Sequence, residues 1–265
     1  MQKNFAAPEE VLYHVGLRPM DLKGAKLAIL PGDPGRVPML AQALGSNAQL
    51  LGSHREYTSW LTYVDQVQVL VCSTGMVGPS VAICLEELAR MGISQCIRVG
   101  TTGTIQEEVD LSDIIIDQAA VRLDGTSTHY APPEYPAVAS FRLTAALERS
   151  ARKSGAPFHL GLSASSDTFW PGQERYDSFS GYVIRKYQGS LKEWQALGVL
   201  NYEMETATLF VVGRVLGLET AALCTVVAKR TDSETVASGT VYTKGMERIV
   251  VILQDALQSL IAESR

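Results

Sequence analysis

Residues 27–44, LAILPGDPGRVPMLAQAL, decide which fold the chain is expected to adopt. The first four are apolar and end at Pro-Gly, as in a short buried strand. From Val37 to Leu44 the apolar residues recur at helical spacing. A buried strand that leads directly into an amphipathic helix is the unit of α/β proteins, in which helices cover both faces of a mostly parallel sheet.

The same alternation continues along the rest of the chain. Predicted strands are 67–72, 96–99, 114–116, 159–164 and 221–227, and predicted helices are 81–91, 141–153, 206–216 and 241–262. No internal repeat, low-complexity tract or Pro/Ser-rich linker divides the sequence. We therefore expect a single domain over residues 1–265.

The composition is that of a globular protein rather than of a disordered or membrane-spanning one. Of the 265 residues, 46% are apolar and 19% are charged. The apolar runs end well before the ~20 residues that a membrane span needs. The formal net charge is −5, so no extended basic surface is available for a nucleic-acid backbone. We expect neither a membrane nor a nucleic acid as partner.

The cysteines and the N-terminal sequence indicate the compartment. No C-x-x-C pair occurs, and each cysteine lies in a stretch expected to be buried, which favours a reducing environment; the four are Cys72, Cys84, Cys96 and Cys224. The first residues, MQKNFAAPEEVLYHVGL, lack the basic segment and apolar run of a signal peptide. The sequence therefore predicts a cytoplasmic protein.

Polar residues that follow the predicted strands are the candidate site residues, because ligands of α/β folds bind beyond the carboxyl ends of the strands. The first group is PGDPGR at residues 31–36, where Gly32 would let the backbone approach an anion and Arg36 would add a forked cation. A Pro-Gly turn with a surface arginine is the alternative. The hexapeptide lacks the glycine order of a dinucleotide site and the lysine of a P-loop.

The second group is RVGTTG at residues 98–103. Arg98 lies in an apolar strand, and a buried guanidinium needs a carboxylate or an anionic ligand beside it. An internal ion pair would meet this need without a ligand. If Arg36, Arg98 and Thr101 meet at one sheet edge, they could together bind a phosphate.

The third group is NYEMET at residues 201–206, with Glu203 and Glu205 at the entry to a predicted helix. The helix dipole stabilises acids at this position. A carboxylate here could instead accept hydrogen bonds from sugar hydroxyls. The spacing does not choose between the two interpretations.

The fourth group lies in residues 165–190, which have no regular period but are rich in aromatic residues, namely Phe169, Trp170, Tyr176, Phe179 and Tyr182. A long irregular segment of this composition predicts a structured substrate-binding insertion. Phe169 offers a flat face to a ring, and Gln173 with Arg175 matches the amide-like edge of a pyrimidine. A surface loop is the alternative. The polar stretch 228–240 is a further candidate, as a lid over the site; it contains Asp232, Ser233, Thr235, Ser238 and Gly239.

Together these segments resemble the nucleoside phosphorylase family in its bacterial, pyrimidine-specific branch. The similarity extends from about Val15 to the C-terminal helix, through LPGDPGRV, SHREYTSW, VCSTGMVGPS, RVGTTGTIQ, VRLDGTSTHYAP, SSDTFWPGQERYD and NYEMETATL. It implies a three-layer α/β/α sandwich of the nucleoside phosphorylase type with a mixed, mostly parallel central sheet. It also implies a homohexamer built from dimers, and a pentosyltransferase that converts uridine and phosphate reversibly to uracil and ribose 1-phosphate in pyrimidine nucleoside salvage and catabolism.

The resemblance assigns a role to each candidate site residue. Phosphate would be bound by Gly32, Arg36, Arg98 and Thr101, with Arg55 of the partner subunit. Ribose would be bound by Met204 and Glu205, with His14 of the partner subunit near the 5'-hydroxyl. Uracil would be bound by Phe169, Gln173 and Arg175, with Arg230 as a more distant, water-linked contact. Arg175, Glu205 and Arg98 form the implied catalytic set.

The resemblance implies no organic cofactor, with inorganic phosphate as co-substrate. It places a monovalent cation, potassium, at the dimer interface on Glu56, Ser80 and the carbonyl of Met76. Trp170 and Lys229 stand where related sequences often carry Tyr and Asn, and residues 1–10 have no close counterpart. Purine-specific relatives use an Asp in the turn that holds Ala228-Lys229-Arg230 here, which disfavours purine nucleosides.

Three other functions remain open from the sequence. A nucleoside hydrolase on the same fold would use water in place of phosphate, and it has little use for three convergent arginines. A nucleoside or phosphate sensor would use the same residues for binding alone. A nicotinamide-dependent oxidoreductase is suggested only by the α/β alternation, and a fold does not fix a function.

Overall fold

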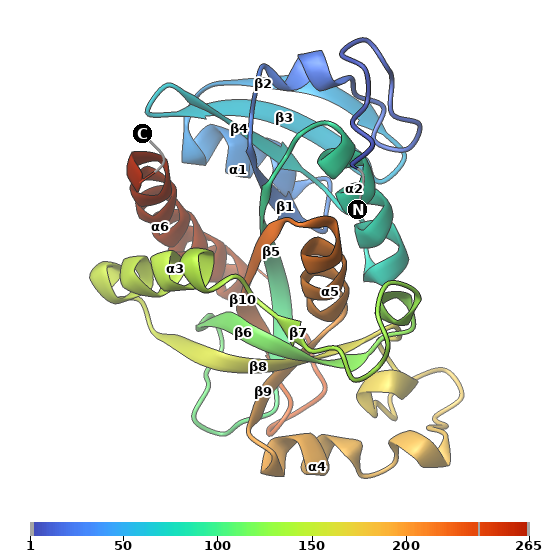
Figure 1. Ribbon diagram of the computed structural model, residues 1–265. Helices are drawn as coiled ribbons and strands as arrows, with labels where there is room; N and C mark the ends of the chain where they lie inside the picture. The colour runs from blue at the N-terminus through green and yellow to red at the C-terminus, as the bar shows by residue number, and fades with distance from the viewer. Residues whose placement is uncertain (1–2, 238, 264–265) are drawn as a thin grey trace.

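Strands and helices alternate along the computed structural model, which describes residues 3–237 and 239–263 (Figure 1). The first half contains β1 (Leu27–Pro31), α1 (Arg36–Leu44), β2 (Ser46–His54), β3 (Tyr57–Val64), β4 (Val67–Cys72), α2 (Val77–Arg90) and β5 (Gln95–Thr104). The second half contains β6 (Ile114–Leu123), β7 (Ala137–Val138), α3 (Phe141–Ser154), β8 (Phe158–Ser166), α4 (Ser190–Ala196), β9 (Val199–Glu203), α5 (Thr206–Leu216), β10 (Glu219–Lys229) and α6 (Thr240–Glu263). Ser238, part of the expected lid, lies outside the described residues.

Within the described residues the strands form one ten-stranded sheet. Its order is β10-β6-β8-β9-β5-β1-β4-β3-β2, with β7 paired to β6. β1 lies between β4 and β5 and is parallel to both, whereas the β2–β3–β4 pairings are antiparallel. β10 pairs with β5 as well as with β6, so β5, β10, β6, β8 and β9 close on themselves. The predicted mixed α/β sheet is confirmed.

Helices cover both faces of this sheet and enclose two apolar cores (Figure 1). On one face α2 and α5 contribute buried residues such as Leu85 and Phe210. On the other face α1, α3 and α6 contribute residues such as Leu40, Leu147 and Leu253. Each fully buried Leu or Phe is worth about 1.5–3 kcal/mol relative to exposure. These two cores hold the sheet rigid from both sides, and its strand ends carry the site.

Some elements were not predicted from the sequence. β2 was missed because its residues are exposed or half-buried and show no apolar alternation. α2 begins at Val77, earlier than the predicted residue 81, since Pro79 is compatible with the first turn of a helix. Residues 165–190 form the end of β8, short 3-10 turns and the start of α4. Among the described residues, no helix combines the length and the apolar character that crossing a membrane requires.

Candidate active site

A cavity of about 490 Å³ lies at the carboxyl ends of β1, β5 and β9, where the sequence predicts the site. Its lining brings together most of the predicted residues: Gly32, Arg36, Glu56, Met76, Arg98, Thr101, Phe169, Gln173, Arg175, Met204 and Glu205. A larger hollow of about 850 Å³ lies between residues 3–5 and the C-terminal ends of α2 and α5. That hollow contains none of the predicted site residues, so the smaller cavity is the candidate active site.

Two arginines present unpaired donors at one end of the cavity. Arg36 follows the β1 turn, and Arg98 lies in the middle of β5. Arg36 Nε, Arg98 Nε and Arg98 Nη1 are buried and form no hydrogen bond within the described residues. Arg36 Nε lies 3.9 Å from Asp33 Oδ2 and Arg98 Nε lies 3.6 Å from Glu203 Oε2, which are ion pairs beyond hydrogen-bond distance. Thr101 lies on the same strand as Arg98 and also lines the cavity. Buried donors are normally satisfied, so this end of the cavity is suited to an oxyanion.

The Gly32 backbone approaches the neighbouring loop closely. A Cβ atom at Gly32 would lie 3.2 Å from the carbonyl oxygen of Gly75 and 3.9 Å from Arg98 Nη1. A larger residue would therefore push the two loops apart beside the unpaired donors. The sequence predicts a glycine here because a ligand would approach the backbone. The structure adds a second reason, the close contact with the Gly75 loop.

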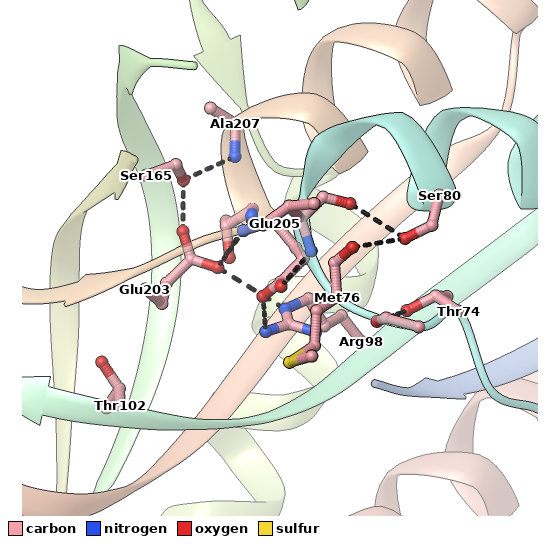
Figure 2. Close-up of polar contacts among 12 residues, drawn as sticks. Thr74, Met76, Ser80, Arg98, Thr102, Ser165, Glu203, Glu205 and Ala207 are labelled. Atoms are coloured by element: carbon pink, nitrogen blue, oxygen red, sulfur yellow. Dashed lines mark hydrogen bonds and ion pairs between the residues drawn. The ribbon is translucent and has the colours of Figure 1, made fainter. Parts of the chain in front are cut away.

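Glu203 and Glu205 have different partners (Figure 2). Glu203 Oε2 accepts hydrogen bonds from the backbone amides of Glu205 and Thr206, both at 2.8 Å. Ser165 donates to the other Glu203 oxygen and accepts a bond from the Ala207 amide at 2.8 Å. Glu203 therefore satisfies the N-terminal amides of α5.

Glu205 pairs with Arg98 and with a backbone amide across the cavity (Figure 2). Arg98 Nη2 donates to Glu205 Oε2, and the Val77 amide donates to Oε1 at 2.7 Å. Val77 has a φ of +63°, which is unusual for a β-branched residue. This conformation lets its N–H reach Glu205 from the turn before α2. One buried carboxylate thus connects three segments, β5, α2 and the start of α5.

Burial changes the ionisation of this cluster. Burial disfavours the charged form of Arg98, but the nearby carboxylates, Glu205 foremost, raise its pKa. Burial also raises the pKa of Glu205, while Arg98 opposes the change. Asp117 on β6 lies behind the same cluster, and burial together with the charge of Glu203 raises its pKa to about 8. Strong perturbations of this kind gather at functional sites.

The other end of the cavity is formed by the insertion. The Arg175 guanidinium lies 4.3 Å from the centroid of the Phe169 ring, a cation–π arrangement. Gln173 and Arg175 are 3% and 2% exposed. Glu174 between them has a φ of +53°, and its carboxylate accepts hydrogen bonds from Ser190 and from the Gly189 and Leu191 amides at the start of α4. This conformation sends Glu174 outward while both neighbours line the cavity.

The chain matches proteins of known family over nearly its whole length. Residues 26–258 match the model of the phosphorylase superfamily. The chain belongs to the phosphorylase superfamily.

Curated members of the superfamily are similar to this chain over most of their length. It is 47% identical to a uridine phosphorylase of Salmonella typhimurium over 94% of this chain and 98% of the relative. It is also 47% identical to a uridine phosphorylase of Haemophilus influenzae, over 95% of this chain and 99% of the relative. Identity to a uridine phosphorylase of Thermococcus kodakarensis is 41%, over 85% of this chain and 80% of the relative.

Arg230 of this phosphorylase lies behind the cavity lining rather than on it. Its Nη1 donates to the Gln173 carbonyl at 2.7 Å, and its Nη2 contacts the Glu174 carbonyl at 3.4 Å. Its Nε and Nη2 also donate to the Glu234 carboxylate at 2.8 and 2.9 Å. The structure therefore places Arg230 as a support for the backbone of the insertion.

His14 and Arg55 do not line the cavity of their own chain but lie together elsewhere on its surface. His14 Nδ1 is 2.7 Å from Glu87 Oε1, and Glu87 also accepts the His14 and Val15 amides. Arg55 Nη2 donates to the Tyr13 hydroxyl at 3.1 Å. The two residues that the phosphorylase resemblance assigns to a partner subunit thus share one surface.

The three residues expected at a cation site also lie together. Ser80 Oγ donates to the Met76 carbonyl at 2.6 Å (Figure 2). Met76 and Glu56 both line the cavity. A Cβ at Gly75 would lie 2.9 Å from Glu56 Cγ and 3.2 Å from Ser80 Oγ. The set contains a carboxylate, a carbonyl and a hydroxyl, which are hard oxygen donors suited to an alkali cation.

Several residues of this phosphorylase site were missed from the sequence. The Val77 amide carries no sequence signal, because the contact uses the backbone. Asp117 lies in the apolar run around residues 114–116, and a carboxylate directly after three isoleucines was a usable signal of a buried acid. Glu234 lies in the stretch predicted as a lid, where a single acid among polar residues has no distinguishing pattern.

Proposed function

We propose that this chain catalyses the reversible phosphorolysis of uridine to uracil and ribose 1-phosphate, as a pentosyltransferase of pyrimidine nucleoside salvage and catabolism. The observation that carries the proposal is that one cavity has a group suited to phosphate at one end and a group suited to a pyrimidine at the other. Unpaired arginine donors lie at one end, and the Phe169–Gln173–Arg175 group lies at the other, with Glu205 among the residues that line the same cavity. The curated relatives named uridine phosphorylase support the choice of nucleoside.

The charges of the cavity follow the charges of the reaction. A phosphate oxygen attacks C1' of the ribose while the bond from C1' to uracil N1 breaks and its electron pair stays on the base. The sugar gains positive character and the base gains negative charge, so a catalyst must stabilise both. Bound phosphate provides the nucleophile and the negative charge beside the sugar. Arg175 and Gln173 stabilise the oxygens of the departing uracil.

The remaining residues bind and orient the substrates. Gly32, Arg36, Arg98 and Thr101 hold phosphate through backbone and charge-assisted hydrogen bonds. Glu205 and Met204 hold the ribose, with the Glu205 carboxylate accepting its hydroxyls. Because Arg98 and the Val77 amide already fix Glu205, the carboxylate is oriented before the sugar arrives.

The proposal includes a homo-oligomer, a hexamer made of three dimers, in which each site is completed by its neighbour. Arg55 of the partner subunit adds a third arginine to phosphate, and His14 of the partner subunit reaches the ribose 5'-hydroxyl. The shared surface position of the two residues supports this arrangement. Glu56, Ser80 and the Met76 carbonyl hold a potassium ion at the dimer interface, where the ion neutralises carboxylate charge beside the rim. We place this single-domain enzyme in the cytoplasm, in keeping with its four buried thiols.

Mixing two inactive variants tests the shared site. Arg55→Ala and Arg98→Ala should each be inactive alone. In randomly mixed dimers about a quarter of the sites combine an intact Arg98 with an intact Arg55 of the partner subunit, so activity should return towards that fraction. An active monomer in light scattering, or no recovery on dissociation and mixing, would refute donation across the interface.

Uridine cleavage followed by absorbance, with and without inorganic phosphate, tests the reaction itself. We expect phosphate-dependent release of uracil, and its collapse in Arg175→Ala. The matched control is Arg152→Ala, because the Arg152 guanidinium also lies over a phenylalanine ring, that of Phe158 at 5.3 Å, but far from the cavity. Cleavage at an unchanged rate without phosphate would instead identify a hydrolase, and tight uridine binding without cleavage would identify a sensor.

A further inference from the structure

Two deeply buried arginines at the base end of the cavity share one carboxylate, that of Glu234. The side chains of Arg175 and Arg230 are 2% and 0% exposed, whereas that of Glu234 is 35% exposed. Arg175 Nη1 lies 2.7 Å from Glu234 Oε2 and also donates to the Glu234 backbone carbonyl at 3.0 Å. Arg230 binds both oxygens of the same carboxylate. Glu234 therefore bridges the two guanidinium groups from the loop after β10.

This arrangement needs its carboxylate for electrostatic reasons. Burial and the neighbouring charge of Arg230 lower the pKa of Arg175, and Glu234 opposes both effects. Within the described part of the chain, no other carboxylate lies within 4.0 Å of either guanidinium. A buried cation without a counter-ion is strongly destabilising. With Glu234 in place, two positive charges and one negative charge leave a net charge of +1 beside the base.

Glu234 also supports two residues that line the base end of the cavity, Arg175 and Gln173. It contacts Arg175 directly, and it contacts Gln173 through Arg230, whose Nη1 binds the Gln173 carbonyl at 2.7 Å. Both contacts to Arg175 use Nη1 alone. The Nη2 and Nε donors of Arg175 therefore stay available to the carbonyl oxygens of a pyrimidine.

We propose that Glu234 is a positioning residue for the pyrimidine base, which fixes the Arg175 guanidinium over Phe169 and, through Arg230, the backbone of Gln173. The inference rests on the proposed phosphorolysis of uridine and adds a residue that controls base recognition. The net charge of +1 that Glu234 leaves matches the single negative charge that develops on the departing uracil.

Substitution of Glu234 tests this role by separating the two substrates. Glu234→Gln and Glu234→Ala should raise the KM for uridine about tenfold or more, equivalent to about 1.4 kcal/mol. The KM for phosphate should change less than about twofold, because phosphate contacts the other end of the cavity. The control is Glu148→Gln, which alters another i, i+4 pair, in which Arg152 Nε and Nη2 on α3 both donate to one Glu148 oxygen, and it should change neither KM. An unchanged KM for uridine in both Glu234 variants would overturn the proposal. A KM for phosphate that rises by the same factor as the KM for uridine would also overturn it.

A double-mutant cycle distinguishes positioning through Arg175 from a general structural effect. In an Arg175→Ala background, adding Glu234→Gln should lower kcat/KM for uridine by a clearly smaller factor than in the unaltered protein. One of the two groups that Glu234 positions, Arg175, is already absent there, and only Gln173, held through Arg230, remains to be displaced. Full multiplication of the two effects would overturn the proposal. Calorimetric titration of uracil in the presence of phosphate gives a readout without turnover and should show the same weakening in Glu234→Gln.

The two proposals fail in different ways. If the unaltered chain does not cleave uridine with phosphate, the proposed function is wrong. If the unaltered chain cleaves uridine and Glu234→Gln behaves like it, only the role of Glu234 is wrong. Thermal unfolding of each variant is measured alongside, and Glu234→Gln keeps the test valid if Glu234→Ala does not fold.

Discussion

Arg98 and Glu205 form a buried ion pair that joins the middle of β5 to the start of α5 inside the cavity. Both side chains are less than one-tenth exposed, and the second oxygen of Glu205 is held by the Val77 amide. Neither charge can be removed without leaving the other buried and incompletely paired. Removal of either member is therefore expected to lower the stability of the protein as well as to alter the cavity.

Removal of Arg98 alone should reduce both properties. Arg98→Ala is expected to lower the free energy of unfolding by about 3–5 kcal/mol and to abolish phosphate-dependent uracil release. The double variant Arg98→Ala/Glu205→Ala should recover part of the stability but no activity. It removes the buried Glu205 carboxylate together with its partner and leaves only Glu203, which lies 3.6 Å from Arg98 Nε in the unaltered protein, without that cation. Unfolding in denaturant measures the free energy of unfolding of both variants. As a control, Arg142→Ala breaks the half-exposed pair with Glu219 and should cost at most about 1 kcal/mol.

Val77→Gly should stabilise the protein. The left-handed conformation at φ +63° is strained for a β-branched residue and natural for glycine, which offsets the entropy that glycine loses on folding. We expect the free energy of unfolding to rise by up to about 1 kcal/mol and kcat to stay within about twofold, because the amide to Glu205 is kept. The adjacent Gly78→Ala should do the opposite, since its Cβ would lie 2.5 Å from Thr208 Oγ1. A destabilised Val77→Gly would contradict the assignment of strain.

Asp117 should make stability fall as the pH rises between about 4 and about 8. Its pKa is about 8 in the folded protein against 3.8 normally, because of burial and the charge of Glu203. Between these values the folded state binds more protons than the unfolded chain, so the free energy of unfolding falls as pH rises from about 4 to about 8. Asp117→Asn cannot ionise, so its advantage over the unaltered protein should grow with pH. Parallel stability curves for the two proteins in urea would refute this assignment.

An opposite sign is expected at Asp255, which makes it a useful control. Hydrogen bonds from Lys153 and Ser150 lower its pKa, so its contribution to stability is present at neutral pH and is lost as the pH falls. The difference in free energy of unfolding between Asp255→Asn and the unaltered protein should therefore shrink as the pH falls into the acid range. The corresponding difference for Asp117→Asn should instead grow as the pH rises from about 4 to about 8.

Glu174→Ala should loosen the insertion. The carboxylate ties the segment between Gln173 and Arg175 to the first residues of α4, and its loss leaves the Leu191 amide without this partner. We expect proteolytic cleavage within residues 176–188 to become faster and the KM for uridine to rise several-fold. Tyr176→Phe removes only an exposed hydrogen bond to Glu174 at 3.2 Å and should change neither. Unchanged proteolysis in Glu174→Ala would contradict the anchoring role.

The parts of the fold that the sequence predicts are those with a strong local pattern. The isoleucines of β6 identify their strand because a strand buried on both faces of the sheet is a continuous apolar run. The periodic apolar face of α6 identifies its helix because burial on one face imposes a helical period. β2 escapes prediction because its stability comes from pairing with β3, a property of two segments together. Convergence of Arg36, Arg98 and Thr101 follows from the rule that parallel strands end at one sheet edge.

The supporting residues of the site could not be found in this way. Arg230 and Glu234 are four residues apart and would be taken for an ordinary surface pair, yet the structure buries the arginine behind Gln173. Glu203 and Glu205 both line the cavity, but only Glu203 accepts the amides at the start of α5, and the residue types do not determine this division. Sequence therefore identifies the residues that line the cavity better than the residues that support them.

The register of β10 against β5 has a consequence for the order of events during turnover. Pairing runs from Glu219 opposite Gln95 to Lys229 opposite Thr104, so Arg98 and Thr101 lie within the paired stretch while Glu234 lies beyond its end. The loop that carries Glu234 can move away without breaking a single hydrogen bond between the two strands. If the chain acts as proposed, inorganic phosphate would stay bound to the paired strands while the nucleoside or free base enters and leaves. The strand register would then allow the two substrates to exchange independently.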